Sequence, residues 1–325
     1  MEFFPISIFQ LLFTSILSVI VTGLICVHIW LKSTVGKFYS NERMDGKTVL
    51  ITGGNNGIGL ETIRDLARRG ARIIMASRKI DLGNQVRDSI MKETGNGNII
   101  VKKLDLSSQK SVREFADEIL RTEKKIDVLI HNAGCASTSN KKKSVDGIEM
   151  TYATNHYGPF LLTHLLIDLL KKSAPCRIII ISSAYYKIAN VDLSNLNPLD
   201  TFPFFLYYVT KTANVMFGLE LAKRLKDTKI SVLIVNPGMT NTDIFKKVPF
   251  PLNLAVKHSF KNAWEGAQTT IMTAVSKKLD GVTGKYYSDC RQEELKSFVK
   301  NEVKNKIFWE ESVKMCRLRH SDPTI

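Results

Sequence analysis

Short apolar runs alternate with longer amphipathic stretches along most of the chain after residue 46. The runs predict strands at 48–52, 72–76, 99–104, 126–130, 177–182 and 230–235. Between them, the spacing of apolar positions predicts helices near 59–69, 82–94, 110–122, 148–171 and 207–226. Strands that are apolar on both faces and separated by helices are typical of a parallel sheet covered on both sides. The pattern therefore predicts an α/β fold with a doubly wound parallel sheet.

A different pattern precedes this region. Residues 6–31 contain no Asp, Glu, Lys or Arg, and their polar members are mostly Ser and Thr. We expect one transmembrane helix, because core helices seldom stay apolar on all faces for so long and no signal-peptide cleavage site follows. Lys32, Lys37, Arg43 and Lys47 follow the segment, whereas only Glu2 and the terminal amine precede it. The positive-inside rule then predicts that the rest of the chain faces the cytosol.

These patterns predict a simple domain organisation. We expect a short tail at 1–5, a transmembrane anchor at 6–31, a juxtamembrane linker at 32–46 and a single domain at 47–325, since no Pro/Gly-rich linker interrupts 47–289 and no internal repeat recurs. The lipid bilayer is therefore an expected partner.

The amino-acid composition excludes several classes of protein. With 44% apolar and 24% charged residues, the 325-residue chain is neither disordered nor collagen-like. The net charge of +15 fits nucleic acid, an anionic membrane or phosphorylated ligands, but Lys and Arg are spread along the chain without an aromatic-basic motif, so we expect no nucleic-acid partner. The five cysteines show no C-x-x-C spacing, so we expect no metal site and no disulfide framework. The oligomeric state stays open.

A glycine-rich loop follows the first expected strand and opens the first expected helix. Glycines there let the backbone approach a pyrophosphate, whose charge faces the helix N-terminus. We expect this Rossmann-type loop to bind a nucleotide cofactor through Thr52, Gly53, Asn55, Asn56, Gly57, Ile58 and Gly59.

The end of the second expected strand bears on the choice of cofactor. NAD sites usually carry an acid there, whereas this strand ends in Arg78 and Lys79, which suit the 2′-phosphate of NADP. A solvated strand end is the alternative, and Asp81 lies close enough to keep NAD open. The ends of the next two expected strands should also line the cofactor cleft, through Asp105, Leu106, Asn132, Ala133 and Gly134.

Tyr207 and Lys211 are the catalytic candidates. On a helix, residues four apart share a face, so both side chains can enter one cleft. A nearby cation favours the phenolate and draws the pKa of a tyrosine toward the working pH, as a general acid/base requires. Ser182 or Ser183, after the preceding strand, can hydrogen-bond the substrate oxygen.

Together these motifs resemble the short-chain dehydrogenase/reductase family, and within it the retinol dehydrogenase-like membrane branch, over roughly 47–289. Four ordered motifs carry the resemblance: the glycine loop, the Asn-Ala-Gly at 132–134, the set of Ser183, Tyr207 and Lys211, and a Pro-Gly turn with a following threonine. The resemblance implies a fourth catalytic residue at Asn155, in a matching segment at 154–163, and a ribose contact from Lys211. It also implies nicotinamide-side contacts from Pro237, Gly238, Thr240 and Thr242.

Some positions depart from the family pattern. His131 stands where the family often has Asn, and Asn236 where the branch often has His. Ser183 lies 24 positions before Tyr207, and the gap is apolar and proline-bearing, with Pro198, Phe202, Pro203, Phe204 and Phe205. We expect 141–143 to be a solvated loop, with contact to anionic lipid as the alternative. The stretch 301–319 either closes the substrate side or lies on the membrane.

The sequence therefore predicts a membrane-anchored NADP(H)-dependent oxidoreductase that prefers NADPH to NADH. The anchor, the aromatic insertion and the family resemblance together imply that it interconverts a carbonyl and an alcohol on an apolar substrate such as a retinoid, a steroid or another lipid alcohol or aldehyde, at the endoplasmic reticulum or a lipid droplet. In carbonyl reduction, Tyr207 would donate the proton, Ser183 would donate a hydrogen bond to the substrate oxygen, and Asn155 would support the path of the proton. The alternative is a catalytically silent nucleotide-binding or scaffold protein on the same membranes, against which the complete catalytic set argues.

Overall fold

The computed structural model describes residues 8–136, 142–240 and 260–325 of the chain. Within them, eight strands form one sheet in the order β3-β2-β1-β4-β5-β6-β7-β8. The strands are β1 (Thr48–Thr52), β2 (Arg72–Ser77), β3 (Ile99–Lys103), β4 (Val128–His131), β5 (Cys176–Ile181), β6 (Ile230–Asn236), β7 (Lys285–Ser288) and β8 (Arg291–Glu293). All pairs are parallel except β7 with β8, which is antiparallel.

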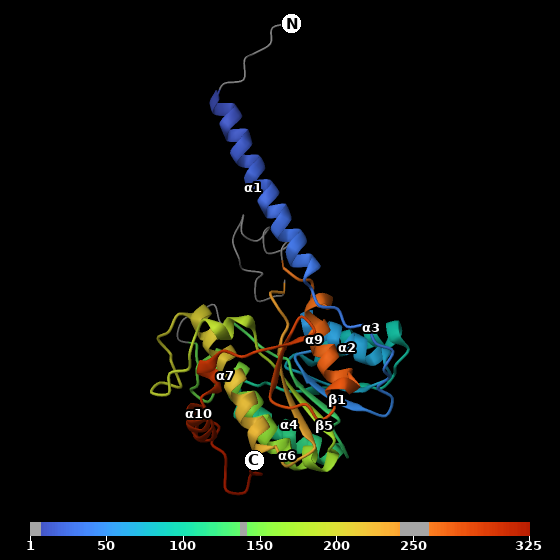
Figure 1. Ribbon diagram of the computed structural model, residues 1–325. Coiled ribbons are helices and arrows are strands. Elements are labelled where there is room, and N and C mark those ends of the chain that lie inside the picture. The colour runs from blue at the N-terminus through green and yellow to red at the C-terminus, as the bar shows by residue number, and fades with distance from the viewer. Residues whose placement is uncertain (1–7, 137–141, 241–259) are drawn as a thin grey trace.

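Helices cover both faces of the sheet (Figure 1). One layer contains α2 (Gly57–Arg68), α3 (Ile80–Thr94) and α9 (Ala263–Val275), and the other contains α4 (Gln109–Thr122), α6 (Gly158–Ser173) and α7 (Pro203–Arg224). A three-residue helix α5 (Met150–Tyr152) and a π-helical turn, Ala153–Tyr157, lead into α6. Short 3-10 turns occur at Ala184–Lys187, Lys277–Leu279 and Ser297–Lys300, and α10 (Glu302–Met315) packs outside α7.

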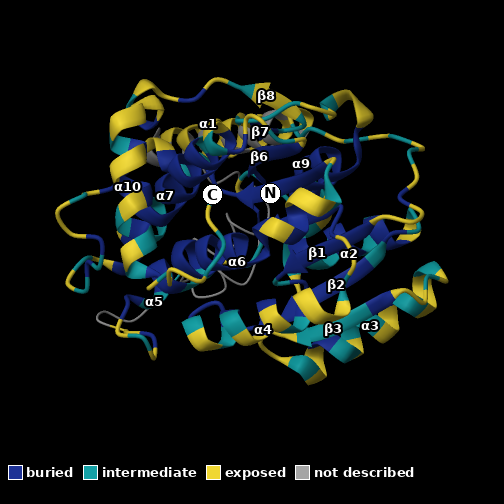
Figure 2. Ribbon diagram, turned by 90° about the horizontal axis from the view of Figure 1, so that it is seen from below, coloured by how far each residue is buried: buried dark blue, intermediate teal, exposed yellow. Residues whose placement is uncertain are grey.

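The two helical layers bury opposite faces of each strand. In β1, Leu50 belongs to the core beneath α4, α6 and α7, while its neighbours Val49 and Ile51 belong to the core beneath α2 and α9. All five residues of β1 are buried, which explains why the strand is a continuous apolar run and does not alternate. Figure 2 shows buried strands at the centre and exposed residues on the outer helices. The predicted doubly wound parallel sheet is confirmed.

Element boundaries differ from the predicted ones where local chemistry acts. Helix α7 begins at Pro203, four residues before the predicted start, because proline is favoured in the first turn of a helix. The predicted helix over 148–171 is divided by the π-helical turn. Strands β7 and β8 were not predicted, because runs of four and three residues are too short to show a periodicity.

Helix α1 (Ile8–Ser33) extends away from the sheet and its covering helices (Figure 1). Among its described side chains, Leu12, Ile16, Val19 and Ile25 are exposed. Within the part of the chain that the structure describes, no helix combines the length and the apolar character needed to cross a membrane.

The linker after α1 lies along the domain. The Phe38 amide donates to Oε1 of Gln268 on α9 at 3.0 Å. The guanidinium of Arg69 lies 5.7 Å from the centroid of the Phe38 ring and donates to the carbonyls of Ser40 and Glu42. Contacts with both α2 and α9 therefore fix the path of the linker.

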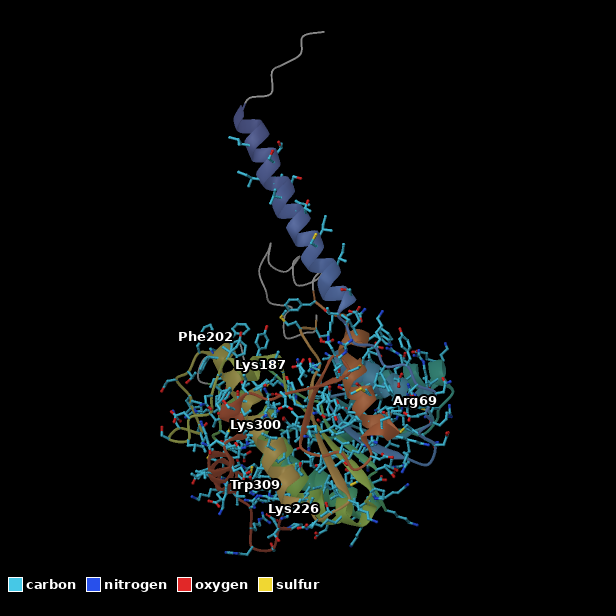
Figure 3. The ribbon with its side chains drawn as sticks, viewed as in Figure 1. Arg69, Lys187, Phe202, Lys226, Lys300 and Trp309 are labelled. Atoms are coloured by element: carbon cyan, nitrogen blue, oxygen red, sulfur yellow. The ribbon has the colours of Figure 1, made fainter. Side chains whose placement is uncertain are left out.

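Helix α10 is part of the domain core. Phe308 and Trp309 are buried, and the Trp309 ring packs against Phe160 and Phe217 on α6 and α7. Trp309 lies at the end of the domain remote from α1 (Figure 3). Neither prediction for 301–319, a cover over the substrate side or a helix on the membrane, describes this packing.

Candidate active site

A cleft crosses the carboxyl ends of the strands, where parallel α/β sheets bind ligands. It consists of a cavity of about 540 Å³ beside β2 and β3 and one of about 270 Å³ beside β5 and β6. Both are lined by Gly53, Asn56, Ala133 and Gly134. The two cavities therefore form one continuous cleft that passes over the glycine loop.

The loop between β1 and α2 requires its glycines. Gly53 and Gly57 have φ angles of 73° and 55°, in the left-handed region that favours glycine. A Cβ atom on Gly59 would collide with the carbonyl oxygen of Gly53. Helix α2 starts at Gly57, so its first amides face the cleft, with Ile58 in the wall of the smaller cavity.

Thr52 and Asn132 hold this loop in position. The Asn132 Nδ2 atom donates to the carbonyls of Thr52 and Gly53 at 2.9 and 2.7 Å. The Thr52 hydroxyl oxygen accepts from the amides of Asn132 and Ala133, both at 3.1 Å. Both side chains line the cleft as predicted, but the Thr52 hydroxyl and the Asn132 Nδ2 atom make hydrogen bonds within the protein.

Three cations line the outer end of the larger cavity. Arg78 and Lys79 lie there as predicted, and both are exposed. Lys142 lines the same cavity, although the sequence placed it in a solvated loop. Asp81 is not in the cavity wall; Asp105 is, and its Oδ1 atom accepts from the amide and hydroxyl of Ser107 at 2.9 and 2.7 Å.

Asn55 offers an unused acceptor close to this end. Its Nδ2 atom donates to the Ser77 hydroxyl at 2.7 Å, while its Oδ1 atom is buried without a partner among the described residues. Leu106 and Leu82 add apolar wall beside it. A glycine loop, a buried free acceptor and an apolar wall together fit an adenine dinucleotide.

Ser183, Tyr207 and Lys211 all line the smaller cavity. The Lys211 Nζ atom lies 5.2 Å from the centroid of the Tyr207 ring and donates to the Ile181 carbonyl at 3.3 Å. The buried Ser182 hydroxyl donates to the Lys211 carbonyl at 2.7 Å. Of the two candidate serines, Ser183 is therefore the one with a hydroxyl free to donate into the cavity.

Burial shifts the pKa values of both titratable side chains, Tyr207 and Lys211. It raises the pKa of the Tyr207 phenol well above its usual value, and the neighbouring Tyr185, Cys135 and Tyr208 add to the increase. Burial lowers the pKa of the Lys211 ammonium to about 8. Lys211 is not among the groups that shift the Tyr207 pKa, so the lowering expected from this cation is not seen, and desolvation sets the direction of the shift.

Asn155 lies in the π-helical turn before α6. Its side chain accepts from the Cys135 amide and donates to the Cys135 carbonyl, both at 2.8 Å, and donates to the Thr210 hydroxyl at 3.1 Å. A Cβ atom on Gly134 would lie 3.6 Å from both Asn155 Oδ1 and Lys211 Nζ. The π-helical turn, a distortion frequent at functional sites, thus brings Asn155 beside Lys211 without a direct bond.

Pro237, Gly238 and Thr240 also line the smaller cavity, whereas Thr242 lies outside the described residues. Asn236 braces this turn: its Oδ1 atom accepts from the amides of Ala184 and Gly238 at 3.1 and 2.9 Å.

The other departure from the family pattern, His131, is structural. It is buried, its Nε2 atom contacts the Thr163 hydroxyl at 2.8 Å, and burial lowers its pKa to about 3. The imidazole is therefore neutral at physiological pH and does not reach the cleft wall.

Sequence reasoning missed Tyr185 and Met239. Both line the smaller cavity, with the Tyr185 hydroxyl 3.7 Å from the Met239 sulfur. The Tyr185 ring also stacks on Tyr208 at a centroid distance of 4.6 Å. The only signal for these residues was their position just after β5 and β6.

Comparison with known proteins agrees with this geometry. The family model for short chain dehydrogenases matches residues 47–250. The chain belongs to the short-chain dehydrogenase family. Retinol dehydrogenase 14 from Mus musculus is 42% identical over 78% of this chain and 80% of its own length. Retinol dehydrogenase 12 from Bos taurus is 38% identical over 84% of this chain and 87% of its own length.

Solved structures share the fold. An uncharacterized protein from Mycobacterium paratuberculosis superposes with a TM-score of 0.70 at 29% identity, covering 87% of this chain and 98% of that one. A short chain dehydrogenase from Escherichia coli CFT073, complexed with NADPH, gives a TM-score of 0.62 at 21% identity, covering 78% and 100%. Within its family, the chain belongs to the retinol dehydrogenase-like branch, and it is an oxidoreductase acting on CH–OH groups with a nicotinamide nucleotide cofactor.

Proposed function

We propose that this oxidoreductase uses NADP(H), with NADPH preferred, to interconvert a carbonyl and an alcohol on an apolar substrate such as a retinoid, a steroid or another lipid alcohol or aldehyde. One observation carries the proposal: a single cleft joins Arg78 and Lys79 at one end to Tyr207 and Lys211 at the other. A dinucleotide that spans it would place its 2′-phosphate among cations and its nicotinamide beside the general acid.

Each catalytic side chain has a separate role in carbonyl reduction. NADPH, when bound, supplies the hydride. Tyr207 donates its proton to the carbonyl oxygen, to which Ser183 donates a hydrogen bond as negative charge develops there. Lys211 holds a positive charge beside the Tyr207 ring and stabilises the phenolate that remains. Asn155 fixes the backbone at Cys135 and, through Thr210, the helix that carries Tyr207 and Lys211.

The cations support a preference for NADPH. Arg78 and Lys79 are exposed and line the cavity, as does Lys142. No ion pair joins these three side chains to an acid among the described residues, so each can bind phosphate. A charged hydrogen bond to phosphate contributes more than a neutral one, about 1.5–3 kcal/mol.

The surroundings of the smaller cavity support an apolar substrate. Phe202, the residue that precedes α7, and Phe204 and Phe205 in its first turn are exposed, shortly before Tyr207. Phe202 is 65% exposed and lies at the end of the domain from which α1 extends (Figure 3). The relatives named retinol dehydrogenases support the same class of substrate.

Membrane anchoring belongs to the same proposal. The uncharged stretch at 6–31 would span the membrane of the endoplasmic reticulum or a lipid droplet as a single anchor, with the domain in the cytosol. In intact microsomes, added protease should then digest the domain, and a glycosylation sequon engineered near Lys143 should stay unmodified. Protease protection together with glycosylation would place the domain in the lumen. Removal by an alkaline carbonate wash would mean that 6–31 lies on the membrane surface.

A turnover screen tests the enzymatic part. The full chain in detergent is supplied with NADPH or NADH and with retinal, steroid ketones or fatty aldehydes, and Tyr207→Phe serves as the matched control. We expect oxidation of NADPH by at least one carbonyl, and turnover lower by about 10² or more with the variant. NADPH binding without turnover of any carbonyl would favour the silent scaffold, and tighter binding of NADH than NADPH would overturn the cofactor assignment.

A further inference from the structure

Lys261 stabilises the turn at 237–239, which lines the smaller cavity. Its amide donates to the Met239 carbonyl at 2.9 Å, and its Nζ atom donates to the Pro237 carbonyl at 3.2 Å. Its side-chain stem lies against Gly238, where a Cβ atom would come within 2.8 Å of Lys261 Cε. Main chain and side chain of one residue thus hold three successive residues of the turn, all of which line the cavity.

Asp289 holds Lys261 in this position. The Lys261 Nζ atom lies 2.6 Å from Asp289 Oδ1, and the side chain of Lys261 is only 12% exposed. Asp289 occupies the tight turn between β7 and β8, with a φ angle of 49°. A nearly buried ammonium paired with a carboxylate on a rigid turn has little freedom to leave the Pro237 carbonyl.

The same carboxylate oxygen also reaches the linker. The Gly36 amide donates to Asp289 Oδ1 at 3.1 Å, three residues after α1 ends at Ser33. Glycine is required there, because a Cβ atom would overlap the backbone of Asp289. One oxygen atom therefore joins the segment that follows α1 to the residue that fastens the turn.

We infer that Lys261 and Asp289 are positioning residues for the nicotinamide half of the cofactor, and that docking of the linker at Gly36 sets their position. The inference rests on the proposed cofactor site, because the turn at Pro237 matters to catalysis only if the nicotinamide lies against it. The adenosine half lies in the other cavity, whose walls include none of these three residues.

Because the two halves of the cofactor lie in different cavities, a ligand that contains only the adenosine half serves as a test. In the full chain, Lys261→Met removes the ammonium and keeps the length of the side chain. We expect NADPH affinity to fall by up to about tenfold, because the turn against the nicotinamide half is no longer held in its binding position, while affinity for 2′,5′-ADP, which lacks the nicotinamide, stays unchanged. Asp289→Asn and Gly36→Ala should act in the same direction, and Gly36→Ala combined with Lys261→Met should cost less than the sum of the two. Lys300→Met, which breaks the exposed pair with Glu294, is the matched control.

Amide hydrogen exchange without cofactor gives a second, independent measurement. The amides at 238–240 should exchange faster in Lys261→Met and Gly36→Ala than in the natural protein, while those at 53–59 should not change. Unchanged exchange at 238–240 in Lys261→Met, or an equal loss of NADPH and 2′,5′-ADP affinity, would overturn the inference. If the natural protein bound neither nucleotide, the proposed function would fail, and the exchange data alone would decide whether Lys261 and Gly36 position the turn.

Discussion

The Lys211 ammonium nitrogen lies 5.2 Å from the centroid of the Tyr207 ring, one helical turn away on α7. At this distance the cation stabilises the negative charge that develops on the phenol as the proton leaves. Tyr207 thus keeps its proton, with a pKa raised by burial, until a substrate oxygen accepts it. The arrangement is that of a general acid in carbonyl reduction.

Tyr207→Phe removes the proton donor and keeps the ring. We expect turnover to fall by about 10² or more, the usual contribution of a general acid, with NADPH affinity retained. Tyr208→Phe is the matched control and should have little effect, because Tyr208 stacks on Tyr185 and does not line either cavity. Steady-state kinetics and NADPH fluorescence titration measure both variants, and an inactive Tyr208→Phe beside an active Tyr207→Phe would refute the assignment.

Lys211 should make stability depend on pH in the alkaline range. Burial lowers its pKa from 10.5 to about 8, so below pH 8 both folded and unfolded states are protonated and the folded state bears the full cost of a buried charge. Between pH 8 and 10.5 the folded state loses the proton first, and the free energy of unfolding contributed by this group rises. Lys211→Met removes this cost, on the order of 3 kcal/mol.

Urea denaturation of the natural protein and Lys211→Met at pH 7 and pH 10 measures this difference. The variant should be the more stable at pH 7, and the gap should narrow toward pH 10 as the natural protein gains. The exposed Lys226→Met should keep the same pH dependence as the natural protein. A gap that widens as the pH rises would show that the Lys211 ammonium is stabilised in the fold.

Much of the fold was predictable from the sequence because its determinants are local. A strand buried on both faces, such as Thr48–Thr52, must be apolar throughout, and the four-residue spacing of Tyr207 and Lys211 puts them on one helix face. Residues placed by long-range packing were not predictable. Lys261 reaches the turn only because β7 and β8 bring Asp289 beside it, and no pattern in the sequence indicates that pairing.

The direction of the Tyr207 pKa shift could not be predicted for the same reason, because it depends on long-range packing. The sequence shows the nearby cation but not the depth of burial, and burial decides the direction of the shift. Likewise, Lys142 belongs to a run of three lysines that looks like a solvated loop, and only the path of the chain brings it to the cofactor cleft.

Arg78→Ala should lower NADPH affinity by roughly 10- to 100-fold, the effect of one charged hydrogen bond to phosphate, and should barely change NADH affinity. Lys142→Ala should act in the same direction, because it lines the same cavity. Arg121→Ala, an exposed arginine outside the cleft, is the matched control. Fluorescence titration with both nucleotides measures the effect, and an equal loss for NADH and NADPH would show that Arg78 does not bind the 2′-phosphate.

Trp309→Ala should destabilise the domain without changing the site. The buried indole packs against Phe160 at a centroid distance of 4.8 Å, and the guanidinium of Arg224 lies 4.5 Å from the ring. Its removal leaves a cavity between α10 and α7, and such truncations typically cost about 3–5 kcal/mol. Val303→Ala on the same helix, at a side chain 70% exposed, should cost no more than about 0.5 kcal/mol. Urea denaturation measures both free energies of unfolding.

Because α10 does not line the cleft, the Kd for NADPH of the folded Trp309→Ala protein should equal that of the natural protein, and a weaker affinity would mean that α10 supports the site directly.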